Sequence, residues 1–266
     1  MKHSTLVAAA ASLLFAQAAL AVPSVTIVDT YEGSDSNGYG DVIGNTNRFD
    51  IHSMEVQLNG SLLTVSINTA FAGRNDDGSF ASYTNTVYGQ GQGIGYGDLF
   101  LSDSWDPFGT APYVLDDNTN GTAWSYGFSL GNDLTAAYDR WDLNGEGTLY
   151  ALNTDESNDH NALLSDDFMS GAIFRNGQEV AVDTEADGVT AVGSGSWTTG
   201  SGDVTFLIDL TGTDLLNSDE IAIHWNMTCG NDTIEGSYAV PSPSLLMLLA
   251  SGLPLLGLAG FLRRKS

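Results

Sequence analysis

The sequence is poor in cysteine, histidine and basic residues, and each shortage excludes a class of protein. Cys229 is the single cysteine, which excludes an intramolecular disulfide framework, and with four histidines a cysteine-rich zinc site is excluded too. Lys and Arg number 8 against 33 Asp and Glu. Four of the basic residues lie at the chain ends, so the middle of the chain sets four arginines against 33 acids, a formal charge of −29. Such a surface repels phosphate backbones, so nucleic acid is excluded as a partner, and it attracts divalent cations.

The remaining composition is typical of a folded domain with appendages at its ends. Hydrophobic residues make up 42% of the 266 residues and charged residues 15%, a balance that suits one packed domain of about 200 residues. The chain contains no HExxH helix and no P-loop. Paired carboxylates serve glycoside hydrolases, but 33 acids supply such pairs anywhere in the chain. We therefore expect a protein that is not an enzyme, with a secreted hydrolase as the weakest alternative.

The N-terminus has the three parts of a secretory signal peptide. Lys2 precedes the apolar run Leu6 to Phe15, and the small residues Ala19 and Ala21 occupy the positions that signal peptidase reads. The run is too short for the alternative, an uncleaved membrane anchor. We predict a signal peptide over residues 1–21 and an exported mature chain.

The C-terminus has the composition of a membrane-spanning helix. Leu245 to Leu262 is an apolar stretch of 18 residues with Ser251 as its one polar side chain. At 1.5 Å per residue it would reach about 27 Å, enough for a bilayer core. The basic cluster Arg263, Arg264 and Lys265 would keep the extreme end in the cytoplasm and leave the acidic domain outside.

The order of parts at this end carries a resemblance. A proline motif (Val240, Pro241, Ser242, Pro243), the apolar helix 245–262 and the basic cluster 263–265 follow one another over residues 240–266. This tail resembles the PEP-CTERM sorting tail of Gram-negative bacteria. The resemblance implies that an exosortase releases the protein from the inner membrane, and that it belongs to the cell surface or extracellular matrix, together with exopolysaccharide or biofilm.

One position departs from the family pattern. Ser242 stands where the family usually has Glu, which leaves a variant sorting enzyme or a plain membrane anchor as alternatives. The segment 223–236 also resembles the stretch that often precedes such tails, and this likeness implies no chemistry.

Residues 22–239 show the two-residue period of β-strands. Met54 to Leu58 and Leu63 to Ile67 alternate around Asn59-Gly60, which predicts a hairpin with a type I′ turn. A second Asn-Gly, Asn176-Gly177, lies between two further apolar pairs. With glycine-rich turns and no sustained helical period, we predict an all-β fold, an antiparallel β-sandwich of jelly-roll type. Further strands are expected at 25–28, 99–101, 124–130, 149–152, 204–208 and 221–225, with one short helical turn near 214–216.

The beginning of this domain is similar to another family. Asp29 to Gly33, Asp41 and Phe49-Asp50-Ile51 loosely resemble the opening of the DOMON and family 9 carbohydrate-binding β-sandwiches. That resemblance implies an early acidic loop that binds calcium and aromatic residues that pack against sugars.

Acidic loops are the first candidates for a site, because calcium prefers six to eight oxygen ligands. The first choice is the loop with Asp35, Asp41 and Asp50. A second loop, residues 116–121, fits the first half of an EF-hand with Asp116, Asn118 and Asn120, although its twelfth position is Gly127. The alternative for every such loop is a solvated turn, since Asp, Asn and Gly are the usual turn residues.

Aromatic residues in loops are the second candidates. Trp105 and Trp141 lie among Asp and Gly and are candidates to contact a sugar, whereas Trp124 alternates with core residues. His224 beside Trp225 is read as a structural histidine, and Cys229 as an inert thiol.

The sequence thus predicts an exported, non-catalytic, acidic β-domain of the cell surface, with calcium as the candidate cofactor. The main alternative is a carbohydrate-binding module with an aromatic sugar site.

Overall fold

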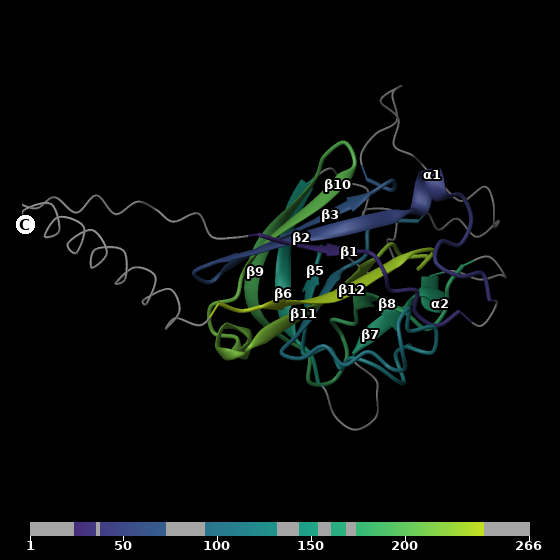
Figure 1. Cartoon of the computed structure of the whole chain (residues 1–266). Helices are drawn as coiled ribbons and strands as arrows, with labels where there is room; N and C mark the ends of the chain where they lie inside the picture. The colour runs from purple at the N-terminus through teal and green to yellow at the C-terminus, as the bar shows by residue number, and fades with distance from the viewer. Residues whose placement is uncertain are drawn as a thin grey trace, which may run out of the picture.

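The computed structural model describes residues 24–35, 38–72, 94–131, 144–153, 161–168 and 174–241. Ten strands form one antiparallel sheet in the order β1-β2-β3-β10-β9-β6-β5-β4-β11-β12, and β7 pairs with β8 in a small second sheet (Figure 1). The all-β, antiparallel prediction is confirmed. The strands are β1 (Val25–Val28), β2 (Ile51–Asn59), β3 (Leu62–Thr69), β4 (Leu99–Ser102), β5 (Tyr126–Ser129), β6 (Asn144–Ala151), β7 (Ala162–Leu164), β8 (Glu179–Val182), β9 (Thr190–Thr199), β10 (Asp203–Asp209), β11 (Glu220–Asn226) and β12 (Thr233–Ala239), with the short helices α1 (Thr46–Phe49), α2 (Ser165–Phe168) and the 3₁₀ turn η1 (Asp214–Asn217).

The large sheet curls until its two edge strands face each other. β12 lies against both β1 and β2 (Figure 1), although in the described part of the chain no hydrogen-bonded ladder joins β12 to either. A Cβ placed on Gly236 of β12 would lie 2.7 Å from Ile27 Cγ2 of β1. We call this line of contact between β1 and β12 the seam. The sheet is therefore nearly closed into a barrel.

The predicted first hairpin is present, but its turn differs. β2 and β3 pair from Ile51 to Thr69, and Asn59 pairs with Leu62, so the two loop residues are Gly60 and Ser61. Of these two, only Gly60 has a positive φ, 65°. A type I′ turn needs positive φ at both positions, whereas a type II′ turn needs it at the first alone. The type I′ prediction is wrong because the strands extend one residue further than the hydrophobic alternation.

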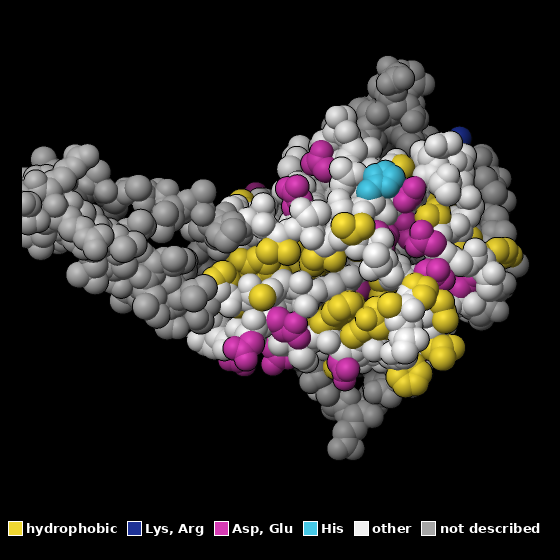
Figure 2. All heavy atoms as spheres, in the orientation of Figure 1, with side chains coloured by type: hydrophobic (Ala, Val, Ile, Leu, Met, Phe, Trp, Pro, Cys, Tyr) yellow, Lys and Arg dark blue, Asp and Glu magenta, His cyan; other side chains and the backbone are white. Residues whose placement is uncertain are grey.

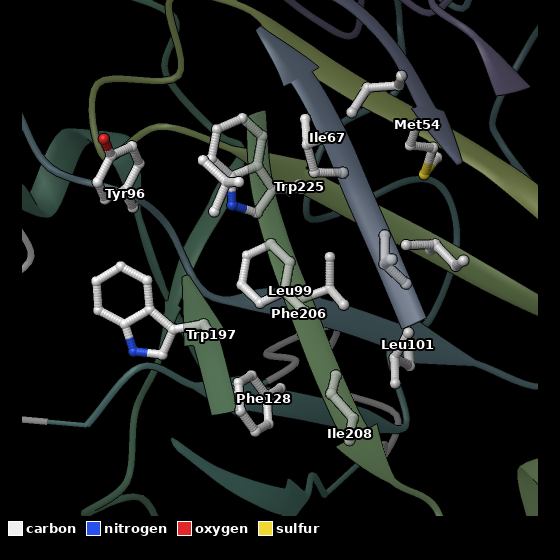
Figure 3. Packing of buried hydrophobic residues seen from close by; sticks show 14 of the residues in the cluster. Met54, Ile67, Tyr96, Leu99, Leu101, Phe128, Trp197, Phe206, Ile208 and Trp225 are labelled. Atoms are coloured by element: carbon white, nitrogen blue, oxygen red, sulfur yellow. The ribbon is translucent and has the colours of Figure 1, made fainter. Parts of the chain in front are cut away.

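The core lies inside the curved sheet, on the alternating positions that the sequence showed. Figure 3 shows Trp197, Phe206 and Trp225 facing the same interior space from β9, β10 and β11. All three are at most 4% exposed. Burying aromatic side chains of this size is a main source of stability in an all-β domain.

One part of this core is built from glycines and a single aromatic ring. Gly147 of β6 pairs with Gly195 of β9. A Cβ on Gly147 would lie 2.3 Å from Phe128 Cζ, and one on Gly195 would lie 2.9 Å from Phe128 Cε2. The Phe128 ring of β5 therefore packs on this glycine pair, and a backbone carbonyl also stands close to each Cβ position, that of Ser129 at Gly147 and that of Leu207 at Gly195.

Some predicted elements differ in the structure. The second Asn-Gly does not connect two paired strands, since β8 pairs with β7 and Phe174 lies in no strand. β7, β9 and the C-terminal edge strand β12 were not predicted. The remaining predicted strands and the turn near 214 have counterparts in β1, β4, β5, β6, β10, β11 and η1.

Several predictions fall on residues outside the described ranges. None of the described helices is both long and apolar enough to span a bilayer, and the predicted spanning stretch 245–262 is not among the described residues. The other predicted positions outside those ranges are Ala19, Ala21, Ser242, Pro243, Arg263, Arg264, Lys265 and Trp141.

Candidate metal centre

Three carboxylates from distant parts of the chain meet at one end of the seam. Oxygen atoms of Asp29, Asp41 and Asp232 all lie within 4.8 Å of one another. Asp29 directly follows β1, Asp232 directly precedes β12, and Asp41 lies in the loop that leads to α1. Figure 2 shows acidic side chains gathered on the face beyond the end of β1. We call these three residues the carboxylate cluster.

Two of the three carboxylates are held by backbone amides. Asp232 is fully buried, and its Oδ2 accepts from Ile51 N at 2.6 Å while its Oδ1 accepts from Thr233 N at 2.9 Å. Oδ1 of Asp29 accepts from Tyr31 N at 3.3 Å, but its Oδ2 is buried and has no hydrogen-bond partner. Burying an unpaired polar atom is costly, so this oxygen is suited to bind a further ligand.

A buried arginine organises the loops around the cluster. Arg175 is fully buried and donates to four backbone carbonyls, those of Gly33, Gly40, Asp41 and Gly230. These bonds tie Gly33, Gly40 and Asp41 to the turn before β12. With all three carboxylates ionised, one guanidinium leaves a formal charge of −2, which matches a divalent cation.

The mutual proximity of the carboxylates changes their acidity. Burial, followed by the charge of Asp41, raises the pKa of Asp29 to about 8. Burial and the charge of Asp29 raise the pKa of Asp232 to about 9, and burial and Asp50 raise the pKa of Asp41. A bound cation favours ionised carboxylates, so its binding would release the protons that the cluster otherwise holds near neutral pH.

The first predicted calcium loop contributes one member to the cluster. Asp41 belongs to it, and Asp50 lies close enough for its charge to raise the pKa values of Asp29 and Asp41. Asp50 Oδ1 also lies 3.3 Å from His52 Nδ1. Asp35 is not a member; its carboxylate accepts from Tyr39 N within its own loop.

The second predicted loop forms a hydrogen-bonded turn instead. Asp116 is buried, and its Oδ2 accepts from Phe108 N at 2.9 Å. Asp117 Oδ1 accepts from the backbone amides of Thr119 and Asn120. Asn118 N donates to Gly177 O. Asp116, Asn118 and Asn120 are therefore engaged in or beside a turn, and Asp116 belongs to no group of three metal-ligating side chains among the described residues.

Trp105 is half-buried at the edge of a second buried network. Its indole Nε1 donates to Glu235 Oε2 at 3.1 Å, and its backbone N donates to Glu220 Oε1 at 3.0 Å. Its ring meets Tyr113 edge-on, with centroids 5.6 Å apart. The indole orientation is thus fixed by the protein itself.

His224 lies at the centre of this network and is fully buried. Its Nδ1 lies 2.9 Å from Glu235 Oε1, and its Nε2 lies 2.8 Å from the Glu179 carbonyl. Burial disfavours the charged ring, but the hydrogen bond and charge of Glu235 raise the pKa of His224 above its usual value. Because a carbonyl and a carboxylate both accept, an imidazolium satisfies both contacts. His224 is structural, as its sequence context indicated.

Two further residues have no catalytic setting. The pentapeptide Gly127-Phe128-Ser129-Leu130-Gly131 fits the Gly-x-Ser-x-Gly pattern of hydrolase nucleophile elbows, which need an exposed Ser on a sharp turn. Ser129 instead ends β5, pairs with Thr148 and is 4% exposed. Burial raises the pKa of the Cys229 thiol to about 12, so this thiol is inert.

At the proline motif, Val240 N donates to Asp219 O at 2.9 Å, and the described chain ends at Pro241.

The main residues that sequence reasoning missed are Asp232 and Arg175. In the sequence, Asp29 stands out only through the likeness of residues 29–33 to the DOMON and family 9 sandwiches. Arg175 and Asp232 lie far from Asp41 in the sequence. Only the closure of the sheet brings Asp232 beside Asp29. No local sequence signal marks Asp232: it lies in a polar run next to Thr233, and its burial becomes visible only in the structure. The chain matches no protein-family model, no curated protein and no solved structure.

Proposed function

We propose that this chain is an exported, non-catalytic protein whose acidic β-domain binds a divalent cation, calcium, at the carboxylate cluster. The observation that supports it is the buried, unpartnered Oδ2 of Asp29 within a group of three carboxylates. Calcium takes hard oxygen ligands and accepts carboxylates in mono- or bidentate form. Asp29, Asp41 and Asp232 would supply the charged ligands, and the ion would stiffen the domain and offset part of its negative charge.

The proposed location of the protein rests on its two chain ends. The leader 1–21 would direct export through signal peptidase, and the tail 240–266 would hold the protein in the inner membrane until an exosortase releases it. The destination is the cell surface or extracellular matrix of a Gram-negative bacterium, in association with exopolysaccharide or biofilm. Within this proposal the domain is a jelly-roll-like sandwich, since the two curved halves of the sheet pack against each other through one core.

A calcium titration of the purified, metal-free protein tests the proposal. A ligand that binds only the folded state raises the free energy of unfolding by RT ln(1 + [L]/Kd), about 2.7 kcal/mol at 100 times Kd. We expect the melting temperature to rise by several degrees in calcium and to return to its original value in EDTA. A melting temperature that does not respond to calcium would contradict the proposal.

A specific observation favours a carbohydrate-binding module as the second candidate. Trp105 is half-buried while Glu235 fixes the indole orientation, and a fixed aromatic ring is a suitable platform for a sugar face. Loss of binding to a purified exopolysaccharide in Trp105→Ala, with an unchanged melting temperature, would support this candidate.

A further inference from the structure

We propose that the cation acts as a latch that closes the seam between β1 and β12, so that calcium controls how firmly the N-terminal edge strand is held. This inference rests on the proposed calcium site and assigns that site a conformational role. Its basis is the position of the ligands, which come from both sides of an unpaired sheet edge.

The seam holds together without a ladder. β1 and β12 are the two ends of the large sheet, and Ile27 of β1 packs against Gly236 of β12. β1 has four residues, and Val25 and Val28 are 40% and 62% exposed. The pairing with β2 therefore holds β1 in place, and little buried apolar surface adds to it. A short edge strand of this kind is expected to open at low free-energy cost.

The carboxylate cluster sits at one end of this seam. Asp29 is the residue after β1, and Asp232 is the residue before β12. Asp232 already connects the start of β12 to β2, the neighbour of β1, because its Oδ2 accepts from Ile51 N, the first residue of β2. An ion bound by Asp29 and Asp232 together adds a second bridge, this time to β1 itself.

The consequence follows from linkage. The ion meets its full set of carboxylates only when Asp29 and Asp232 lie together, which requires a closed seam. A ligand that prefers one conformation increases the population of that conformation. Calcium should therefore protect β1 more than it protects strands inside the sheet.

Hydrogen exchange of the full chain with calcium or with EDTA measures this. We expect the amides of β1 to exchange at least about tenfold more slowly in calcium, while those of β10, which pairs on both sides, stay within about twofold. Calcium that raises the melting temperature but leaves β1 and β10 equally affected would overturn the latch and leave the calcium site intact. No response of either the melting temperature or exchange would overturn both proposals.

A covalent replacement for the latch gives the second test. The Gly236 Cβ position lies 3.7 Å from Ile27 Cβ, within the range of disulfide-bonded pairs. In the double variant Ile27→Cys/Gly236→Cys, the first substitution removes the Cγ2 atom that would obstruct the second. Cys229 is fully buried, so it should not compete for the bridge.

The oxidised and reduced forms of this variant are matched controls for each other. We expect the oxidised form to protect β1 without calcium and to bind calcium about tenfold more tightly than the reduced form, because its ligands are already brought together. Equal calcium affinity of the two forms would overturn the latch.

Discussion

Carboxylate oxygens of Asp29 and Asp232 lie within 4.8 Å of each other, although the two residues belong to opposite edges of one ten-stranded sheet. Both side chains are anchored by backbone amides of the strands and loops around them. The pair therefore reports directly on whether the sheet is closed.

Removing one ligand should abolish the calcium response. Asp41 is the exposed member of the carboxylate cluster, so Asp41→Asn should fold normally but lose most of the calcium-induced rise in melting temperature. Asp103→Asn removes the same charge from an exposed position outside the cluster and should keep the full response. Differential scanning calorimetry in calcium and in EDTA distinguishes them, and equal responses would argue against the site.

Arg175 should be among the most sensitive positions for stability. Arg175→Met leaves four backbone carbonyls without their donor and removes the positive charge beside the carboxylate cluster. We expect a loss of about 3–5 kcal/mol in the free energy of unfolding. Arg175→Lys should lose less, because an ammonium group can still donate up to three hydrogen bonds.

Urea unfolding measures both Arg175 variants. Arg48→Met, at an exposed position of α1, is the control and should change the free energy of unfolding by about 0.5 kcal/mol or less. A loss below about 1 kcal/mol in Arg175→Met would contradict a structural role for the guanidinium.

Stability in EDTA should increase as the pH falls from 8.5 to 5.5. Burial raises the pKa of Asp116 to about 8 and that of Glu179 to about 7, and the pKa of His224 is also raised. In each case the folded state holds more protons than the unfolded state in this range, so the free energy of unfolding falls as the pH rises. The contribution of His224 to the free energy of unfolding is complete below the ordinary pKa of histidine, and it is lost as the pH rises through the higher pKa of His224 in the folded state.

Urea midpoints across this pH range test the sign. Asp116→Asn imitates the protonated carboxyl and should make the pH dependence shallower. A wild-type protein that is most stable above pH 8 would contradict the assignment.

Glu235 should control the charge of His224. In Glu235→Gln the amide oxygen can accept from Trp105 and the amide nitrogen can donate to His224 Nδ1, which suits a neutral ring. We expect the pKa of His224 to fall, with a loss of about 1–3 kcal/mol in stability. Nitrogen-15 chemical shifts of the imidazole give the pKa, with Glu55→Gln, an exposed position on β2, as the control. An unchanged pKa would mean that Glu235 does not hold the proton on Nδ1.

The glycine pair beneath Phe128 should tolerate no side chain. Gly147→Ala places a methyl group 2.3 Å from Phe128 Cζ and 2.7 Å from the Ser129 carbonyl oxygen, so both the ring and the backbone of β5 have to move, and we expect a loss of about 1–3 kcal/mol. Ser194→Ala, at an exposed position of β9, should be nearly neutral. Thermal melts compare the two variants, and equal stability would show that the ring has room to shift.

The sequence predicted the strands that carry large core side chains of their own. β2, β3, β10 and β11 each bury alternating aliphatic or aromatic side chains of their own, so the period of two is visible. β9 was missed because two of its inward positions are Gly193 and Gly195, beneath Leu149 of β6 and Phe128 of β5. The side chains that cover these positions of β9 thus belong to other strands, so β9 itself shows no alternation of hydrophobic residues there.

The candidate site was predictable only in part for a similar reason. Asp41 lies in a loop whose acidic composition is visible in the sequence and predicts a calcium site there. Asp232 is a single acid in a buried segment, and it becomes part of a site only because closure of the sheet brings it next to Asp29. Local composition cannot show a contact that depends on the pairing of the whole sheet.

The arrangement of Phe128 over Gly147 and Gly195 also constrains how this domain can diverge. A side chain added at either glycine would meet the ring and also a backbone carbonyl, that of Ser129 at Gly147 and that of Leu207 at Gly195. A smaller residue at 128 therefore makes no room for it and only leaves a cavity. In descendants of this sequence, the two glycines should remain glycines even where the residue at 128 changes.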